Sequence, residues 1–175
     1  MKIGILSDTH SKVKKAKECL DLLIEDGAEF IVHAGDVCEV QTLELLKNCS
    51  KRYVVVYGNN DAHLVAFHNE YNLVQEPHYF KLDNTKFKLM HLPFYMAPDT
   101  EIIISGHTHE FHAELNNGTL FLNPGESCAR NKPVSECAML ELKEKKFLVT
   151  HYTKAKDKKK FKTQEFSFKR GKKSE

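Results

Sequence analysis

Short apolar runs alternate with amphipathic segments in the first third of the chain. Three of these runs are short enough for buried strands, at residues 2–6, 30–32 and 53–57. Between the first two, apolar residues recur every three or four positions from Val13 to Ile24, which predicts a helix with one apolar face. A second helix is expected at about residues 40–48. The order strand, helix, strand, helix, strand calls for a parallel sheet with right-handed crossovers.

The rest of the chain has the pattern of short, mostly antiparallel strands. Residues 79–82 and 87–92 flank a turn signal, and the Asn-Gly pair at 117–118 separates two further short strands. Another pair of strands flanks the charged residues 143–146. We therefore expect an α/β (α+β) fold in which two sheets pack together with helices outside.

Composition and length narrow the class of protein. The chain has 175 residues, of which 41% are hydrophobic and 29% charged, as is ordinary for one soluble domain. No apolar stretch approaches the ~18 residues that a membrane span needs, and the first residues lack the pattern of a signal peptide. Five cysteines, an odd number without a Cys-x-x-Cys pair, favour free thiols in a reducing compartment. These features exclude membrane and secreted classes and predict a cytoplasmic protein.

Charge is distributed unevenly along the chain. Residues 154–175 hold ten Lys and Arg against three acidic residues, a net charge of +7, whereas residues 1–153 hold 16 against 21, a net charge of −5. We therefore predict a domain over 1–153 and a basic C-terminal tail over 154–175. Three phenylalanines are interleaved with the lysines of the tail, at Phe161, Phe166 and Phe168. The tail either contacts the phosphates of a nucleic acid weakly or is a solvated segment with one last edge strand.

Polar residues of only a few types follow the apolar strands. In chain order they are Asp8 and His10, His33 and Asp36, Asn59, Asn60 and Asp61, His91, and finally His107 and His109. Ligands of open α/β sheets bind outside the carboxyl ends of the strands. Carboxylate, amide and imidazole groups suit divalent ions such as manganese, iron, zinc or nickel, and a carboxylate can bridge two ions. The sequence therefore predicts a site for two metal ions.

Each motif also has a purely structural explanation when it is taken alone. Asp8 and His10 are typical of a turn or helix cap, and residues 58–61 of a tight turn. His91 is compatible with a buried histidine at a strand end. Only the Gly-His-Thr-His segment at 106–109 favours metal binding unaided. The joint occurrence of all these motifs at successive strand ends carries the metal prediction.

Together the motifs resemble the five signature blocks of the calcineurin-like metallophosphoesterases. The matching residues are Ser7-Asp8-Thr9-His10, Gly35-Asp36, Gly58-Asn59-Asn60-Asp61, His91 and Gly106-His107-Thr108-His109. Asn123-Pro124-Gly125 resembles the turn that follows the last block in the small single-domain phosphodiesterases of bacteria and archaea. The resemblance spans residues 1–142 and implies a two-sheet β-sandwich flanked by helices, with α/β/β/α layers.

The resemblance implies a binuclear, metal-dependent phosphodiesterase or phosphoesterase, in which a metal-bridging hydroxide attacks phosphorus in line. One metal would be held by Asp8, His10, Asp36 and His109. The second would be held by Asp36, Asn59, His91 and His107, with Asp36 as the bridge. The expected metals are two divalent ions, manganese first, with nickel, zinc or iron as alternatives. The candidate catalytic residues are Asp36, Asn59, Asn60 and Asp61, of which Asp61 is expected to orient ligands.

Two positions depart from the pattern of that family. Many members have a histidine where this chain has Asn60, and that histidine helps to protonate the leaving group. An amide cannot act as a general acid, so we expect a preference for good leaving groups. His91 is followed by Leu92-Pro93 instead of glycine, and only 15 residues separate His91 from His107. This segment is therefore expected to form a shortened wall of the substrate pocket, with little room for a helix.

Two other functions compete with the enzyme. One is a non-catalytic protein-interaction scaffold on the same fold, like a retromer coat subunit whose metal-site residues have drifted. The other is an RNA-associated protein led by its basic tail. All seven predicted ligands are residue types that bind metals, whereas a pure scaffold would be free to lose them. We therefore expect a phosphodiester substrate and no membrane partner. Small members of the family often self-associate, so the resemblance leaves both a monomer and a homo-oligomer open.

Overall fold

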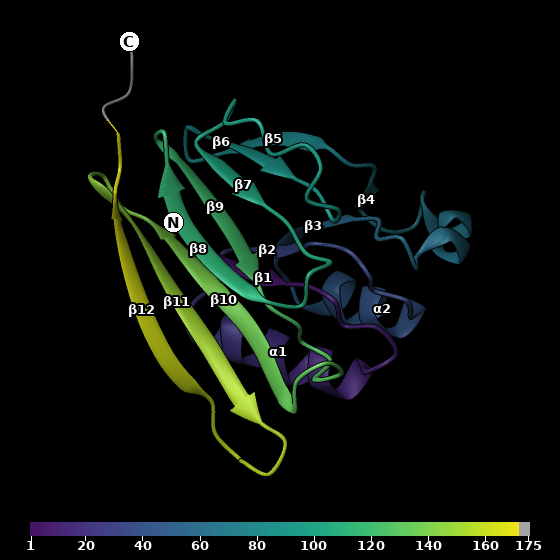
Figure 1. Ribbon diagram of the computed structural model, residues 1–175. Coiled ribbons are helices and arrows are strands. Elements are labelled where there is room, and N and C mark those ends of the chain that lie inside the picture. Colours follow the sequence, from purple (N-terminus) through teal and green to yellow (C-terminus); the bar gives the residue numbers. More distant parts are fainter. Residues whose placement is uncertain (172–175) are drawn as a thin grey trace.

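Two β-sheets stacked face to face form the body of the protein (Figure 1), and the computed structural model describes residues 1–171. In spatial order, the seven-stranded sheet contains β12 (Lys162–Lys169), β11 (Lys146–Ala155), β10 (Val134–Leu142), β1 (Lys2–Leu6), β2 (Phe30–His33), β3 (Arg52–Val56) and β4 (Leu73–Val74). The five-stranded sheet contains β5 (His78–Leu82), β6 (Thr85–Leu89), β7 (Ile102–Ile104), β9 (Thr119–Pro124) and β8 (Phe111–Asn116).

The parallel part of the large sheet follows the predicted order of elements. β1, β2 and β3 pair in parallel, and the crossovers between them are the helices α1 (Val13–Glu25) and α2 (Val40–Asn48). The apolar face of α1 is buried, at Ala16, Cys19, Leu20 and Leu23. In this arrangement the carboxyl ends of β1, β2 and β3 meet at one edge of the molecule.

Alternate residues of the buried strands point to the two faces of the large sheet. Ile5 and Val32 belong to the core between the sheets, where they join Phe87 and Ile102 of the second sheet. Their neighbours on the opposite face pack against the helices, among them Leu6, Ile31 and Val55. Strands buried on both faces read as continuous apolar runs, which explains why these strands were visible in the sequence.

The predicted α/β fold with two sheets and flanking helices is confirmed. Both α-helices pack on the seven-stranded sheet (Figure 1). The α/β/β/α order also requires helices on the outer face of the five-stranded sheet, but within residues 1–171 the segment 90–101 contains no helix. Pro93 and Pro98 lie in this short segment, and proline disfavours a helix interior because it lacks an N–H and clashes with the preceding turn.

A buried lysine fastens that segment to the sheet. Lys88 of β6 is 1% exposed, and its Nζ donates to the carbonyls of Tyr95 and Ala97 at 3.0 and 2.8 Å. The same ammonium group lies 2.5 Å from the carboxylate of Asp99. Irregular backbone thus packs on this side of the second sheet, as the short, proline-containing segment predicted.

Part of the basic tail belongs to the large sheet. β12 pairs with β11 in antiparallel orientation, and Phe166 and Phe168 pack at the border of the main core. β12 is therefore the edge strand that the sequence offered as one alternative. Residues 172–175 of the predicted tail lie outside the described residues, and the boundary between 153 and 154 stays a prediction. In the described part of the chain, no helix is long and apolar enough to cross a membrane.

Candidate metal centre

All seven predicted ligands come together outside the carboxyl ends of five strands. Asp8 and His10 follow β1, Asp36 follows β2, Asn59 follows β3, His91 follows β6, and His107 and His109 follow β7. The first three of these strands belong to the large sheet and the last two to the small sheet. The centre therefore lies where the two sheets meet, and its side chains come from both.

One group of donor atoms gathers around His109. Its Nε2 lies 3.3 Å from Nε2 of His10 and 3.3 Å from Oδ1 of Asp8. Nε2 of His10 also lies 3.8 Å from Oδ2 of Asp36. Two imidazole nitrogens and two carboxylate oxygens thus face one another, as in a site for a divalent ion.

A second group gathers around the amide oxygen of Asn59. This Oδ1 lies 3.0 Å from Nε2 of His91 and 3.1 Å from Nδ1 of His107. Nε2 of His91 also lies 3.5 Å from Oδ2 of Asp36. The same oxygen of Asp36 therefore borders both groups, which is the position that a bridging carboxylate requires.

The hydrogen bonding around the two groups fits metal ions. Oδ1 of Asp8 is buried and has no hydrogen-bond partner within residues 1–171. Leaving such an oxygen unpaired costs free energy, and a cation would satisfy it. His91 Nδ1 lies 2.8 Å from the carbonyl of Ala34. Because a carbonyl only accepts, Nδ1 carries the proton and Nε2 is free to bind a metal.

The backbone of the centre is strained. Five of the seven predicted ligands have positive φ angles, between 43° and 68°: Asp8, His10, Asp36, His107 and His109. A non-glycine residue in this region costs on the order of 1–3 kcal/mol and persists only where the surroundings impose it. Clusters of such residues are typical of functional sites.

Glycines let the loops of the centre approach closely. A Cβ atom on Gly58 would lie 2.2 Å from both N and Oδ1 of Asp36. A Cβ atom on Gly106 would lie 2.1 Å from the hydroxyl of Ser7. Neither separation is tolerated, so these two positions of the sequence motifs require glycine for steric reasons.

The two buried aspartates of the centre have opposite pKa shifts. Burial raises the pKa of Asp8, although the hydroxyl of Ser7 donates to its Oδ2 at 2.5 Å. Burial also opposes ionisation of Asp36, but hydrogen bonds from His91 and Asn60 outweigh it and hold the pKa of Asp36 below its usual range. Burial alone would lower the pKa of His91, yet its hydrogen bonds to Asp36 and to the Ala34 carbonyl raise it. A divalent ion between His91 and Asp36 would take the place of the His91 proton as the partner of the Asp36 carboxylate.

Asn60 and Asp61 contact the loops that carry the ligands. The backbone N–H and side-chain amide of Asn60 donate to the two oxygens of Asp36 at 3.0 and 2.7 Å. The carboxylate of Asp61 accepts from the backbone N–H groups of Val37, Cys38 and Gly58 at 3.2, 2.8 and 2.8 Å. Asp61 therefore ties the loop after β2 to the loop after β3.

One residue of the centre was not identified from the sequence. Glu126 is fully buried, and its Oε2 lies 2.5 Å from Nδ1 of His109. The backbone N–H groups of Asn131 and Lys132 also donate to this carboxylate. Burial opposes its ionisation, but these hydrogen bonds prevail and lower the pKa of Glu126. Because the carboxylate accepts from Nδ1, Nε2 of His109 is left for a metal.

Two cysteines and one histidine that are not among the seven predicted ligands border the centre. Cys38 Sγ lies 3.6 Å from Nδ1 of His10, and Cys128 Sγ lies near the ring nitrogens of His10 and His109. Burial, together with nearby carboxylates, raises the pKa of each thiol to about 12. Both thiols are therefore protonated in the metal-free protein, and a bound cation would favour the thiolate form. His33 is buried beneath the centre, with its Nε2 3.0 Å from the hydroxyl of Thr9.

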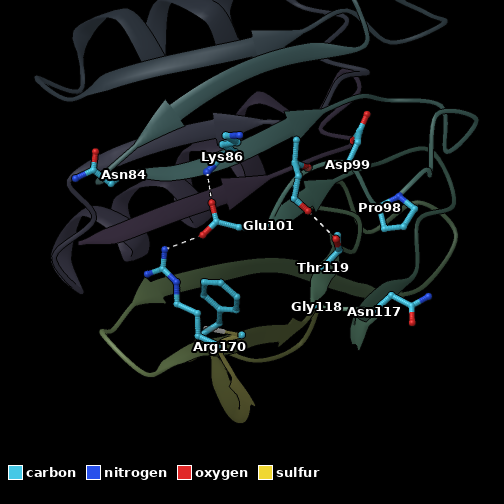
Figure 2. A pocket seen from close by; sticks show the side chains of 12 residues that line it. Asn84, Lys86, Pro98, Asp99, Glu101, Asn117, Gly118, Thr119 and Arg170 are labelled. Atoms are coloured by element: carbon cyan, nitrogen blue, oxygen red, sulfur yellow. Dashed lines mark hydrogen bonds and ion pairs between the residues drawn. The ribbon is translucent and has the colours of Figure 1, made fainter. Parts of the chain in front are cut away.

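A separate cavity of about 420 Å³ lies at the amino ends of β6, β7 and β9, opposite to the metal centre. In Figure 2 the carboxylate of Glu101 faces the guanidinium of Arg170. The carboxylate of Glu101 accepts from the Arg170 guanidinium at 3.0 Å and from the Lys86 backbone N–H at 2.8 Å. The cavity contains none of the predicted site residues.

Comparison with known proteins identifies the family of this chain. The model of the calcineurin-like phosphoesterase superfamily domain matches residues 1–145. A phosphodiesterase of Methanocaldococcus jannaschii is 27% identical over 160 residues, which cover 84% of this chain and 96% of that protein.

Two solved structures show the same fold. Vps29 of Entamoeba histolytica in complex with Zn²⁺ has a TM-score of 0.71 at 21% identity, over 95% of this chain and 99% of that chain. An archaeal phosphodiesterase has a TM-score of 0.71 at 24% identity, over 95% of this chain and all of that chain. With the family match over most of its length, this chain belongs to the calcineurin-like phosphoesterase superfamily.

Proposed function

We propose that the protein is a phosphodiesterase that works with two divalent metal ions. The observation that carries the proposal is the position of Asp36, whose Oδ2 lies 3.8 Å from Nε2 of His10 and 3.5 Å from Nε2 of His91. One carboxylate thus borders two separate groups of donor atoms. Two adjacent sites with a shared carboxylate are typical of metal-assisted displacement at phosphorus.

The donor groups divide the ligands between two ions. Asp8, His10 and His109 would hold the first ion with Asp36, and Asn59, His91 and His107 would hold the second with Asp36. When bound, two such cations supply an activated water at neutral pH and neutralise charge on the phosphoryl oxygens. The protein keeps the ligands in place: the Ala34 carbonyl orients His91, and Asn60 holds Asp36.

We propose manganese as the metal, with nickel, zinc and iron as alternatives. The seven donor atoms are carboxylate and amide oxygens and imidazole nitrogens, which accept all four ions. The structure of Vps29 from Entamoeba histolytica is a complex with Zn²⁺, so this fold holds at least that ion in one relative. Asn60 supports diesters with acidic leaving groups as substrates, because its amide is engaged with Asp36 and cannot protonate a departing oxygen.

A protein-interaction scaffold is the second candidate. It is favoured by the Vps29 structures among the neighbours of this fold and by Phe94, which is 73% exposed on the segment after His91. A scaffold of this kind would not need Asp8, Asp36 and Glu126 to be buried in contact with histidines. The two candidates therefore differ in whether bound metal produces turnover.

The test is a metal-reconstitution assay. The purified protein is stripped with a chelator, and turnover is measured with diesters and monoesters of p-nitrophenol after addition of Mn²⁺, Ni²⁺ or Zn²⁺. We expect no turnover without metal, restored turnover of the diester with Mn²⁺, and slower turnover of diesters with alkyl leaving groups. Metal binding without turnover of any diester would favour the scaffold, and turnover in the presence of chelator would contradict the proposal.

A further inference from the structure

A pocket of about 270 Å³ lies beside the second donor group. Its lining comes from the ends of β3 and β4, from the 3₁₀ helix η1 (Ala62–Phe67) and from the residue after His91. The main lining residues are Tyr57, Asn59, Ala62, Val65, Glu76 and Leu92. We infer that this pocket binds one ester group of the substrate and that this group is a neutral aromatic ring, such as an aryl group or a nucleobase. The inference rests on the proposed function.

The pocket and the metal centre share a wall. Asn59 lines the pocket, and its Oδ1 is the atom that lies 3.0 Å from Nε2 of His91 and 3.1 Å from Nδ1 of His107. Leu92, also in the lining, directly follows His91 in the chain. A phosphoryl group held at the centre therefore has the mouth of the pocket beside it, and one of the two ester groups of a diester can enter.

The lining presents carbon atoms to solvent. Val65 is 58% exposed although it is a large apolar residue, and Ala62 is exposed next to it on η1. The ring of Tyr57 is held in place, since its hydroxyl lies 3.1 Å from Nδ1 of His68 and the two rings stack at an interplanar angle of 14°. Exposed apolar side chains beside a reactive centre are typical of a ligand site, and a fixed aromatic face favours a stacked ring.

The charge and the volume of the pocket determine which ester group it accepts. Oε2 of Glu76 accepts from the backbone N–H groups of His91 and Leu92 at 2.6 and 2.9 Å, which fixes a carboxylate in the wall of the pocket. A negative charge at this place disfavours an anionic substituent, such as a further phosphate. The volume of about 270 Å³ is below the roughly 300–1,000 Å³ of pockets for drug-sized ligands, so it suits a single ring system.

The test compares two phosphonates that differ only in their substituent. Dissociation constants of phenylphosphonate and methylphosphonate are measured by calorimetry on the Mn²⁺-loaded protein. We expect phenylphosphonate to bind about tenfold more tightly, a difference of about 1.4 kcal/mol. Val65→Ser should abolish most of this preference and leave methylphosphonate binding unchanged. Phe94→Ser is the matched control, because Phe94 is 73% exposed and does not line the pocket.

The outcomes separate the pocket from the metal centre. Equal affinity of the two phosphonates, or an equal loss of preference in Val65→Ser and Phe94→Ser, overturns the inference. If metal-dependent diester turnover persists in that case, the proposed function stands. If neither phosphonate binds and no diester is turned over, the proposed function fails and the inference fails with it. A phenyl preference that depends on Val65 and not on Phe94 supports the inference.

Discussion

The two ends of the second sheet differ in the kind of polar side chains that meet there. At the carboxyl ends of β6 and β7, Oδ1 of Asp8 is buried without a hydrogen-bond partner in the described chain, and imidazole nitrogens face one another. At the amino ends, a cavity of about 420 Å³ contains a carboxylate, Glu101, that accepts hydrogen bonds from Arg170 and Lys86 (Figure 2). Nε of Arg170 in this cavity is also buried without a hydrogen-bond partner within residues 1–171. The types of side chain that gather, imidazoles around shared carboxylates, therefore distinguish the candidate metal centre better than cavity volume or unpaired polar atoms do.

Backbone strain shows the same contrast. At the amino ends, the residues with positive φ are Asp83, Asn84, Asn117 and Gly118, which are ordinary residues of hairpin turns. At the carboxyl ends, positive φ falls on histidines and aspartates of the metal centre. Backbone strain that follows from turn geometry carries no functional information. Backbone strain at residues whose side chains can bind a metal does.

Replacing the shared carboxylate gives the largest expected difference between the two ends. Asp36→Asn would leave a neutral amide between the two donor groups, so we expect turnover to fall about a thousandfold, in line with the several kcal/mol that metal ions supply. Elemental analysis should show fewer than two ions per chain. Glu101→Gln at the opposite end is the control and should leave metal content and turnover unchanged. Near-complete turnover with two bound ions in Asp36→Asn would contradict the assignment.

Two glycine substitutions, one at each end of the second sheet, test whether only the candidate metal centre requires the close approach of its loops. The Cβ of Gly58→Ala would lie 2.2 Å from the backbone nitrogen of Asp36. We expect turnover to fall about a hundredfold, because small displacements of reacting groups cost this much. Gly118→Ala meets no atom within 4 Å, but its φ of +79° should lower the free energy of unfolding by about 1–2 kcal/mol. Loss of turnover in Gly118→Ala, or full turnover in Gly58→Ala, would contradict this steric difference between the two ends.

Replacing Glu126, the buried carboxylate that contacts His109, should weaken the binding of one metal ion more than that of the other. Glu126→Gln keeps the size of the side chain but removes the charge that fixes His109, so we expect about tenfold weaker binding of one ion. Calorimetric titration with Mn²⁺ should show this change in one of two binding steps. An equal weakening of both steps would mean that Glu126 supports the fold of the whole centre instead.

Acid titration of the metal-free protein should give the smallest effect. The folded-state pKa of Glu126 lies below its usual value of 4.5, because hydrogen bonds from His109 and two backbone N–H groups prevail over burial. As the pH falls, the unfolded chain therefore takes up this proton first. The stabilisation is present above about pH 4.5 and is lost as the pH falls through the folded-state pKa. Glu126→Gln should reduce this loss of unfolding free energy, measured by urea denaturation with chelator present.

The sequence predicted the elements that follow simple rules, and it predicted which side chains come together at the ends of the strands. Buried parallel strands are continuous apolar runs, and their carboxyl ends meet at one edge, so the amino-acid sequence alone was enough to place Asp8 and Asp36 together. His91 follows a strand of the other sheet, which this rule does not cover, and the family resemblance joined it to them. Helices with one apolar face were equally visible. The short segment after His91, with its two prolines, was expected to have little room for a helix, and residues 92–101 contain none.

Other features depend on contacts between distant segments. Glu126 reaches His109 from a loop after β9, and only the Asn-Pro-Gly turn at 123–125 marks that loop in the sequence. Asn60 could be recognised as a poor general acid, but its hydrogen bonds to Asp36 depend on how two loops meet. The pocket beside Asn59 likewise combines three separate segments of the chain, at residues 57–65, 75–76 and 92.

Anomalous diffraction from crystals of the protein grown with Mn²⁺ tests the central claim most directly. The account predicts two manganese peaks in each chain, on either side of the Asp36 carboxylate. One peak should lie among Asp8, His10 and His109, and the other among Asn59, His91 and His107. A single peak, no peak, or manganese only in the cavity at the amino ends would contradict a binuclear centre.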